Sequence, residues 1–244
     1  MKVFITGGTG SLGQDLVRGL VEGGHDVAFT YHANEECAAT LVGDLSSATG
    51  RCAAFMLDVC DADAVDGVAR AAQGQLGGVD MVINNAAVHA PKAAAWLSTA
   101  DWKQVIDTNL NGSFYVARAF IEPFLAVKHG RFVHLGSVAA RGMTGDVAYA
   151  ASKAGLEGLS ATLAREYGKY GVTSNVLMAG LADTGLAGGK VSDKLQTFWT
   201  EFCPAGRMMT ALDVLNIVEF LGGAQSTFIN GAVLPVTGGL DIAP

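Results

Sequence analysis

The sequence of 244 residues contains only four cysteines, Cys37, Cys52, Cys60 and Cys203. None of them forms a C-x-x-C pair, and none has the spacing of a zinc site. This pattern predicts reduced, buried thiols in a cytosolic protein rather than a disulfide framework. We therefore expect no bound metal.

Positive charge and long apolar runs are also scarce. The 16 lysines and arginines are outnumbered by 23 aspartates and glutamates, which gives a net charge of −7. A nucleic-acid partner would favour a basic patch, so we expect none. No run of about 18 apolar residues is free of charge or glycine, so no membrane span is predicted. The first residues, MKVFITGG, lack the long apolar region of a signal peptide, and we expect a cytoplasmic protein.

Hydrophobic residues nevertheless make up 50% of the sequence, enough for one sizeable core in a single domain over 1–244. Short apolar runs alternate with longer helical patterns, as in strands that are buried on both faces of a parallel sheet. The expected strands are 2–6, 26–31, 52–57, 79–84, 131–136, 172–178 and 231–236. The expected helices are 12–23, 34–48, 61–76, 101–128, 147–170 and 211–222. This alternation predicts a doubly wound α/β Rossmann fold with about seven strands and helices on both faces of the sheet. The least regular part, 181–205, is expected to be a substrate lid.

A glycine-rich turn, TGGTGSLG at 6–13, follows the first expected strand and precedes a helix. Such a turn lets the backbone approach a phosphate, and the helix N-terminus offers N–H groups and a favourable dipole. The strand-turn-helix context therefore predicts a dinucleotide site, with a tight packing turn as the alternative. The candidate cofactor contacts in this turn are Gly7, Thr9, Gly10, Ser11, Leu12 and Gly13.

The end of the second expected strand is the place where a dinucleotide fold reads the adenosine ribose. NAD-binding sites usually carry an acidic residue there, but this sequence has Tyr31 and His32. The missing carboxylate removes repulsion against a 2′-phosphate, and His32 could donate to it. We therefore predict a preference for NADP(H), with NAD(H) possible, and assign Glu35 and Glu36 to the start of the next helix.

The third expected strand is followed by Asp58-Val59. The Asp58 carboxylate could accept a hydrogen bond from the adenine amino group. It could also cap the next helix, and the two roles can coexist.

Tyr149 and Lys153 lie four residues apart in the stretch YAASK at 149–153. On a helix, this spacing brings both side chains to one face. The pair is either an ordinary helix surface with an extended lysine or a catalytic acid/base pair.

The motifs together resemble those of the short-chain dehydrogenases/reductases over nearly the whole chain. They are TGGTGSLG at 6–13, Asp58-Val59, NNAA at 84–87, Asn109 in DTNLNGSF, Ser137 in GSVAA, YAASK at 149–153 and NGAVLPVTGG at 230–239. The order of these motifs is much more specific than any one of them. The resemblance implies a homodimer or homotetramer, with contacts through the helices at 101–128 and 147–170.

The resemblance also implies how the pair in YAASK would work. Tyr149 would supply the proton that the substrate oxygen needs, and the cationic Lys153 would favour its phenolate, because a free phenol has a pKa near 10. Ser137 would bind the substrate oxygen, and Lys153 would also hold the nicotinamide ribose. Asn109 would interrupt its helix and hold a water that links Lys153 to solvent.

Further cofactor contacts are implied at the ends of the fourth and sixth expected strands. Asn84, Asn85, Ala86 and Ala87 would line the adenosine and ribose. Gly180 and Thr184 would contact the nicotinamide amide, with Leu181 or Ala182 nearby.

Four features depart from the family pattern. The glycine spacing is that of the extended branch, with Ser11 in place of a glycine and no basic residue in the turn. Ala87 replaces a glycine, which would strain the backbone if that position needs a positive φ. Ala179 replaces a proline, which predicts a more mobile loop over the nicotinamide. Ser137 and Tyr149 are 12 residues apart, one fewer than in many members, so the loop 138–148 is short.

The sequence narrows the class of substrate less than it narrows the class of cofactor. Ligands of such folds lie outside the carboxyl ends of the strands. The candidate lining residues there are His89, Val138, Met143, Leu181, Phe198, Trp199 and Phe202. Most are apolar, which favours a hydrophobic carbonyl or alcohol, although each could equally be packing.

The overall pattern resembles that of 3-oxoacyl carrier-protein reductases, whose acidic carrier needs basic docking residues. The candidates are Lys128, His129, Arg131 and Lys169, which could equally be solvated surface. Reductases of sugars, steroids, quinones and small ketones remain open. A catalytically weak, cofactor-sensing regulatory protein and an epimerase or dehydratase are the two alternatives from other classes.

Overall fold

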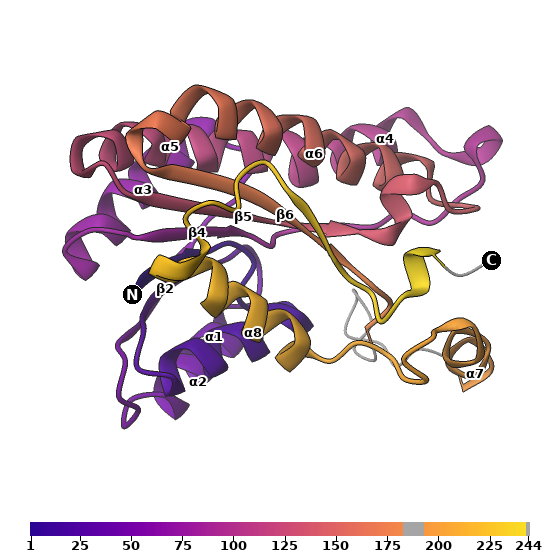
Figure 1. The fold of residues 1–244 in the computed structure, drawn as a ribbon, viewed down its shortest axis with the longest axis horizontal. Helices are drawn as coiled ribbons and strands as arrows, with labels where there is room; N and C mark the ends of the chain where they lie inside the picture. The colour runs from indigo at the N-terminus through magenta and orange to yellow at the C-terminus, as the bar shows by residue number, and fades with distance from the viewer. Residues whose placement is uncertain (183–192, 243–244) are drawn as a thin grey trace.

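The computed structural model describes residues 1–182 and 193–242, and its centre is a sheet of seven parallel strands (Figure 1). The strands are β1 (Lys2–Ile5), β2 (Asp26–Tyr31), β3 (Cys52–Met56), β4 (Met81–Asn84), β5 (Gly130–Ser137), β6 (Val172–Ala179) and β7 (Val233–Val236). Their order is β3-β2-β1-β4-β5-β6-β7, and every neighbouring pair is parallel. The chain reverses direction across the sheet between β1 and β4, so the expected doubly wound fold is confirmed.

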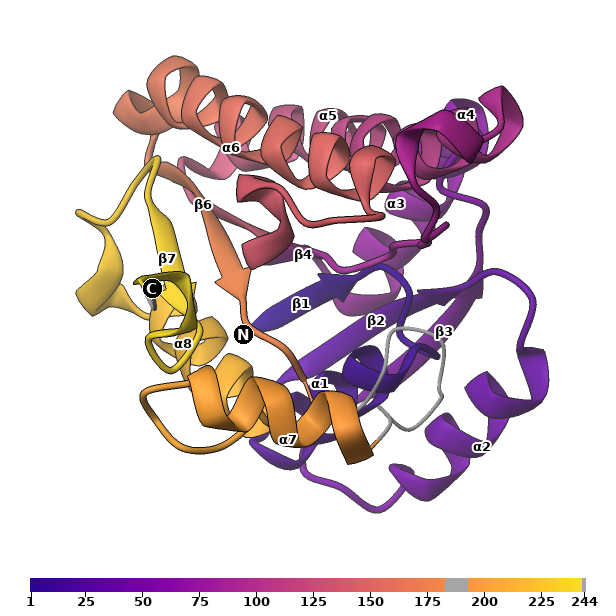
Figure 2. The ribbon, with the colours of Figure 1, turned by 90° about the vertical axis from the view of Figure 1, so that its right-hand side faces the viewer.

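Helices cover both faces of the sheet, as Figures 1 and 2 show. One layer contains α3 (Ala62–Leu76), α4 (Thr99–Ile106), α5 (Gly112–Val127) and α6 (Val147–Tyr167). The other layer contains α1 (Ser11–Glu22), α2 (Glu35–Asp44) and α8 (Ala211–Gly222). The connections are of the strand-helix-strand kind that parallel pairing requires.

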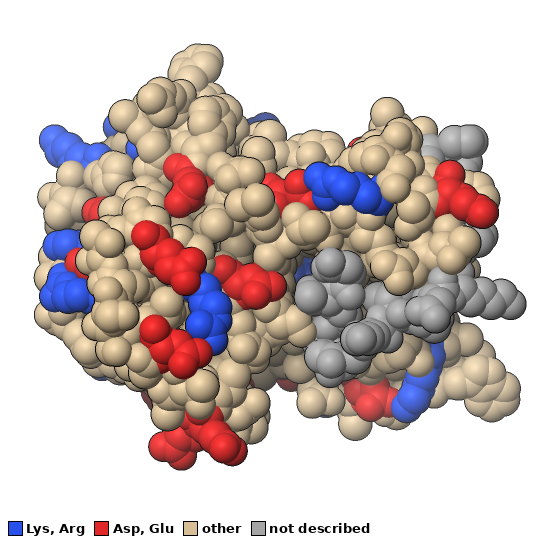
Figure 3. All heavy atoms as spheres, turned by 90° about the horizontal axis from the view of Figure 1, so that it is seen from below, with Lys and Arg blue, Asp and Glu red and all other residues tan. Residues whose placement is uncertain are grey.

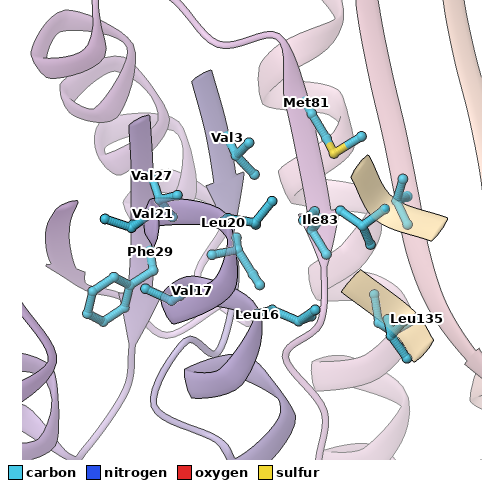
Figure 4. Close-up of a cluster of buried hydrophobic side chains, with 14 of the residues drawn as sticks. Val3, Leu16, Val17, Leu20, Val21, Val27, Phe29, Met81, Ile83 and Leu135 are labelled. Atoms are coloured by element: carbon cyan, nitrogen blue, oxygen red, sulfur yellow. The ribbon is translucent and has the colours of Figure 1, made fainter. Parts of the chain in front are cut away.

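The alternation of side chains along β1 divides the core between the two layers. Val3 and Ile5 pack with α1 and α8, and Figure 4 shows this cluster around Leu16 and Leu20. Phe4 points to the opposite face and packs with Phe120 of α5. Because both faces of the strand are buried, its sequence is a continuous apolar run rather than an alternating one.

The largest difference from the expected elements lies in the region 101–128. This region is not one helix but α4, a π-helical turn η2 (Asp107–Asn111) and α5. The expected interruption at Asn109 is therefore confirmed, because Asn109 lies within the π turn. The expected strand 79–84 begins only at Met81, and the expected helix 34–48 ends at Asp44.

Part of the expected lid at 181–205 forms the helix α7 (Asp193–Phe202), although the sequence there is irregular. Residues 183–192, which include Thr184, lie outside the described residues. Over 1–182 and 193–242, no helix is long and apolar enough to cross a membrane.

The cysteines are unpaired, as expected, but none of the four is buried. Cys60 is exposed in the turn after β3, and the other three are partly exposed. The expectation of buried thiols was wrong, because apolar character alone does not place a residue in the core. Among the described residues, no cluster of histidine, cysteine and carboxylate side chains could hold a metal ion.

Charges of both signs are scattered over the face of the molecule seen in Figure 3. Acidic side chains gather on part of that face, and its described residues form no continuous basic patch. This distribution agrees with the excess of acidic residues in the sequence.

A buried polar network lies between the sheet and the layer of α5 and α6. His134 of β5 is fully buried, with Nδ1 3.0 Å from Asn84 Nδ2 and Nε2 3.2 Å from Ser174 Oγ. Ser174 in turn bonds Ser160 of α6. Burial, with a smaller effect of the Lys153 charge, lowers the pKa of His134 from 6.5 to about 4.

We predict that replacing Phe120 by alanine lowers the free energy of unfolding by about 3–5 kcal/mol, the usual cost of removing a buried aromatic ring. Phe120 is fully buried, and its ring centroid lies 4.9 Å from that of Phe4. Urea unfolding measures the effect. The matched control is Phe228→Ala, because Phe228 is fully exposed and should change the free energy by less than about 0.5 kcal/mol. Equal effects of the two substitutions would contradict the assignment of this core.

We also predict that stability falls as the pH drops from 6.5 to 4. The pKa of His134 is lower in the folded protein than in the unfolded chain, so in this range the unfolded chain binds the extra proton. The free energy of unfolding is therefore up to about 3 kcal/mol lower at pH 4 than at pH 7, because the buried imidazole resists the proton that the unfolded chain takes up. Denaturant unfolding at pH 7, 5.5 and 4.5 should show a shallower pH dependence in His134→Gln. His32→Gln, at an exposed position, should keep the slope of the wild type. If the slope in His134→Gln equals that of the wild type, His134 is not the source of this pH dependence.

Candidate active site

A large cavity opens at the carboxyl ends of the strands. Its volume is about 1070 Å³, whereas ordinary small-molecule sites enclose roughly 300–1,000 Å³. Its walls come from the turns after β1, β2, β3, β4, β5 and β6, together with Trp199 of α7 and Leu240 near the C-terminus. The cavity can therefore accept a dinucleotide and a second molecule together.

The glycine-rich turn forms one end of this cavity. Gly7 has φ +67°, which favours glycine, and a Cβ on Gly13 would lie 2.2 Å from the Gly7 carbonyl oxygen. The side chain of Asn85 donates to the carbonyls of Thr6 and Gly7 at 2.9 and 3.0 Å, which holds the turn against β4. Gly10 is the N-cap of α1 and supplies no capping side chain. The turn therefore has the close backbone and the open helix start that a diphosphate needs.

The six predicted turn residues Gly7, Thr9, Gly10, Ser11, Leu12 and Gly13 all line the cavity. Ser11, which replaces a family glycine, is the first residue of α1. The extended-type glycine spacing therefore still produces a compact strand-turn-helix unit.

The next part of the cavity is lined by Tyr31, His32, Asp58 and Val59. His32 Nε2 lies 3.9 Å from Asp58 Oδ2, and both side chains are largely exposed. Asp58 does not cap the following helix, because Asp61 accepts from the first N–H groups of α3. The alternative role of Asp58 as a helix cap was wrong. Its carboxylate instead accepts from the backbone N–H of Cys60.

The residues after β4 point in different directions. Asn85, Ala86 and Ala87 line the cavity as predicted, but Asn84 is buried in the polar network with His134. The expected place of Asn84 beside the cofactor was wrong, since alternate residues of a strand point to opposite faces. Lys128 is the only non-glycine residue with positive φ in the described chain, so Ala87 is not strained in this way.

Tyr149 and Ser137 meet at the centre of the cavity. Tyr149 lies in the first turn of α6, and Ser137 ends β5. The pKa of Tyr149 is raised to about 12, mainly by burial; a hydrogen bond with Ser137 lowers it, and the Asp146 carboxylate adds a smaller increase. We expected the cation of Lys153 to favour the phenolate. The pKa of Tyr149 instead moves upward, because loss of hydration disfavours the charged form.

Lys153 lies one turn further along α6, on the same face as Tyr149. Its Nζ is 5.5 Å from the ring centroid of Tyr149 and donates to the carbonyl of Leu135 at 2.6 Å. Burial lowers the pKa of Lys153 to about 8. The predicted shared face is therefore present, and the amine remains largely cationic at neutral pH.

Asn109 lies behind this pair, in the π turn. Its side chain donates to Ser152 Oγ and to the carbonyl of Val88, both at 3.0 Å, and accepts from the Val88 N–H at 2.8 Å. Asn109 therefore ties the loop after β4 to the helix that carries Tyr149 and Lys153.

The sixth strand brings Gly180 to the cavity wall beside Leu181 and Ala182. Ser137 and Ala179 are paired in the register of β5 and β6, so Gly180 follows directly beside Ser137. A Cβ on Gly180 would lie 3.0 Å from the backbone of Thr237, which explains a glycine at this position.

Of the candidate substrate contacts, His89, Val138, Met143, Leu181 and Trp199 line the cavity. Phe202 does not line the cavity, although it was expected to, and it is 44% exposed on α7. The side chain of Phe198 lies outside the described part. The sequence reasoning missed Asp146, which bonds His89, because the two residues are 57 positions apart.

The expected basic cluster for a carrier protein is wrong for Arg131, and its other members stay untested. Arg131 is buried, and its guanidinium donates to the carbonyls of Gly130 and Gly171. Lys128, His129 and Arg131 also lie at the start of β5, whereas the cavity lies at the end of that strand. Eight residues of strand separate these ends by roughly 23 Å.

Comparison with known proteins agrees with this geometry. A family profile described as enoyl-(acyl carrier protein) reductase matches residues 7–241. The 3-oxoacyl-(acyl-carrier-protein) reductase FabG of Chlamydia muridarum is 34% identical over 239 residues, covering 97% of this chain and 96% of the relative. The 3-oxoacyl-(acyl-carrier-protein) reductase MabA of Mycobacterium tuberculosis is 33% identical over 240 residues, covering 98% and 92%.

Solved structures give the same result. A short-chain alcohol dehydrogenase structure from Sinorhizobium meliloti has a TM-score of 0.93 at 29% identity, covering 100% of this chain and 97% of that one. A double mutant of a Serratia marcescens short-chain dehydrogenase/reductase has a TM-score of 0.88 at 28% identity, covering 98% and 97%. The chain belongs to the short-chain dehydrogenase/reductase family, whose members are oxidoreductases acting on carbonyl and alcohol groups.

Proposed function

We propose that this protein transfers a hydride between a nicotinamide dinucleotide, preferentially NADP(H), and a carbonyl or alcohol substrate. Tyr149 acts as the acid/base, and residues 1–244 form one dinucleotide-binding and catalytic domain. The observation that carries the proposal is the convergence of the glycine turn, Ser137, Tyr149 and Lys153 on one cavity.

The dinucleotide would be held along the wall that starts at the glycine turn. Backbone groups of 7–13 would bind the diphosphate, and Tyr31, His32, Asp58 and Val59 would surround the adenosine. Asn85, Ala86 and Ala87 would line the middle, and Gly180 and Thr184 would contact the nicotinamide end. The tight packing of the turn supports this assignment, because a Cβ on Gly7 would meet the backbone of Ala86 and a Cβ on Gly13 would meet the Gly7 carbonyl, so larger residues would disturb the turn that presents these backbone groups.

The protonation state of Tyr149 decides its role in the reduction. With its pKa raised to about 12, the phenol keeps its proton at neutral pH. Ser137 would hold the substrate carbonyl oxygen beside the phenol. Tyr149 would then protonate this oxygen as negative charge develops on it, and it would accept the proton in the reverse reaction.

Lys153 would stabilise the phenolate that remains after proton transfer. Its cation lies 5.5 Å from the tyrosine ring, in a buried site where charges interact more strongly than in water. Lys153 would also hold the nicotinamide ribose. Asn109, through Ser152 and Val88, would keep α6 aligned with the loop after β4.

The cavity walls favour an apolar substrate. Val138, Met143, Leu181 and Trp199 line it beside the Ser137–Tyr149 pair. The named relatives are 3-oxoacyl-(acyl-carrier-protein) reductases, which supports a 3-oxoacyl-type substrate for this chain. If a carrier protein docks, it would do so around the mouth of the cavity rather than at the basic residues near the start of β5.

We further propose that the protein works in the cytoplasm as a homodimer or homotetramer. The four unpaired cysteines suit a reducing compartment. Trp102 of α4 and Phe114 of α5 are large apolar side chains on the surface, and such exposed groups suit a contact between copies.

We predict that Tyr149→Phe lowers turnover of carbonyl substrates by at least about 100-fold, because general acid catalysis is lost. Binding of NADPH, followed by quenching of tryptophan fluorescence, should survive. Tyr170→Phe is the control, because Tyr170 lies in the turn after α6 and does not line the cavity. Normal turnover in Tyr149→Phe would reject the mechanism. Binding of cofactor without turnover of any carbonyl by the wild type would instead favour the regulatory protein.

We also predict that the protein binds NADPH more tightly than NADH. His32→Ala should weaken NADPH binding about tenfold, because a hydrogen bond to a charged phosphate is lost, and should leave NADH binding unchanged. Trp199 lines the cavity and can report both ligands by fluorescence. His129→Ala, near the opposite end of the sheet, is the control. A preference for NADH would overturn the cofactor assignment while the enzyme assignment stands.

A further inference from the structure

A histidine and an aspartate form a pair beside Tyr149 that the proposed acid/base mechanism does not use. His89 Nε2 lies 2.7 Å from Asp146 Oδ1. The His89 ring meets the Tyr149 ring edge-on, with centroids 5.0 Å apart. Both members of the pair line the cavity, with side chains 30% and 12% exposed.

Asp146 is directed towards His89 although a different partner is available to it. It occupies the N-cap position of α6, where an aspartate usually accepts from the first N–H groups of the helix. No such capping bond is made, and the carboxylate instead accepts from His89. The loops that carry the two residues are joined by a hydrogen bond from the Lys92 N–H to the carbonyl of Gly145. The pair is therefore held by its backbone as well as by its own bond.

The hydrogen bond to Asp146 leaves one nitrogen of His89 available. An ionised carboxylate only accepts hydrogen bonds, so Nε2 carries the shared proton. Nδ1 has no hydrogen-bond partner within 1–182 and 193–242. This nitrogen accepts from a hydroxyl group when His89 is neutral and donates to a carbonyl oxygen when His89 is cationic.

The charge of the pair restricts what it can bind. With a cationic His89 the pair is neutral, and with a neutral His89 it carries one negative charge. In neither state does it offer the net positive charge that would attract a carboxylate. An uncharged oxygen suits the pair instead: a hydroxyl can donate to Nδ1 in the neutral state, and the oxygen of a ketone, ester, thioester or alcohol can accept from Nδ1–H in the cationic state.

From this geometry, we infer that His89, held by Asp146, binds a second, uncharged oxygen of the substrate close to the reacting carbonyl. The inference rests on the proposed function, since Tyr149 and Ser137 take the reacting oxygen. Because the rings of His89 and Tyr149 are in contact, the oxygen bound by His89 must lie only a few substrate atoms away from the reacting oxygen bound by Tyr149. The substrate class is therefore an apolar chain with two nearby oxygen functions, as in a 3-oxoacyl ester or thioester or a hydroxyketone.

The test compares ketones that are matched in length. Ethyl 3-oxobutanoate and 2-heptanone have the same number of chain atoms, but only the ester has an oxygen near the ketone. A third substrate, 4-hydroxy-2-heptanone, replaces the second carbonyl with a hydroxyl. Values of kcat/KM are measured with NADPH for the wild type, His89→Phe, Asp146→Ala and Tyr170→Phe. His89→Phe keeps a ring against Tyr149 but removes the nitrogens.

In His89→Phe, we expect kcat/KM to fall about tenfold for the ester, the hydroxyketone or both, the usual effect of one hydrogen bond. The value for 2-heptanone should stay within about twofold of the wild type. A loss for the ester indicates that Nδ1 donates, because an ester oxygen can only accept. A loss for the hydroxyketone alone indicates that Nδ1 accepts from the hydroxyl. In Asp146→Ala, kcat/KM should fall for the same substrates, because the hydrogen bond that orients the His89 ring is lost. This change costs α6 no capping bond. Tyr170→Phe changes a residue that does not line the cavity and should leave the ratios unchanged.

Equal losses for all three substrates in His89→Phe, or no loss for any of them, would overturn the inference. If His89→Phe does not fold, the substrate ratios of Asp146→Ala decide by the same criteria. Turnover of 2-heptanone that depends on Tyr149 would keep the proposed function even when the inference fails. If the wild type reduces none of the three ketones with either cofactor, the proposed function fails and the inference fails with it.

Discussion

Parallel pairing of all seven strands is the constraint on which the site depends. Because every strand runs in the same direction, the turns that follow them meet at one edge of the sheet. The register of β5 and β6 pairs Ser137 with Ala179, and the hydrogen bonds of Asn85 bring the end of β4 against the turn after β1. Groups from positions 7 to 240 thereby line one cavity. A shift of register would move Ser137 away from Tyr149 and turn its side chain to the other face.

Burial then determines the chemistry of the groups that meet there. Tyr149, Lys153 and His134 are all removed from water, and in each case burial moves the pKa toward the neutral form, although Lys153, with a pKa of about 8, still carries its charge at neutral pH. For Tyr149 this means a phenol that keeps its proton at neutral pH. For His134 it means an uncharged ring that can complete a network of hydrogen bonds between the sheet and α6. The protein tolerates these buried polar groups because most of them have partners, such as the Leu135 carbonyl for Lys153.

The two walls of the cavity have different roles in this account. The wall made by the turns after β1 and β4 is rich in glycine, alanine and exposed backbone, which suits the proposed dinucleotide. The wall made by Val138, Met143, Leu181 and Trp199 is apolar, and His89 and Asp146 interrupt it beside Tyr149. Binding a substrate oxygen at that interruption would select among carbonyl compounds without altering the acid/base group. A hydrogen bond placed in an apolar wall discriminates strongly, because a substrate without the matching group leaves a polar atom unpaired.

Much of this arrangement is encoded in local sequence patterns. The continuous apolar runs predicted the strands, because strands in a parallel sheet are buried on both faces. The spacing of Tyr149 and Lys153 predicted their shared face, because residues four apart on a helix are neighbours. The glycines at 7, 10 and 13 predicted the open turn. These features depend only on residues that are close in the chain.

Other features depend on contacts between distant residues, and only the tertiary structure decided them. The pKa of Tyr149 moves upward because the assembled core excludes water from it, which its neighbours in sequence do not reveal. Arg131 is buried and Asn84 points away from the cavity because of the packing on their sides of the sheet. His89 meets Asp146 only because the loops after β4 and β5 lie side by side. The sequence by itself determined the elements and the chemical groups, whereas the fold decided which groups are dry, which are paired and which face the substrate, because burial and pairing arise between segments far apart in the chain.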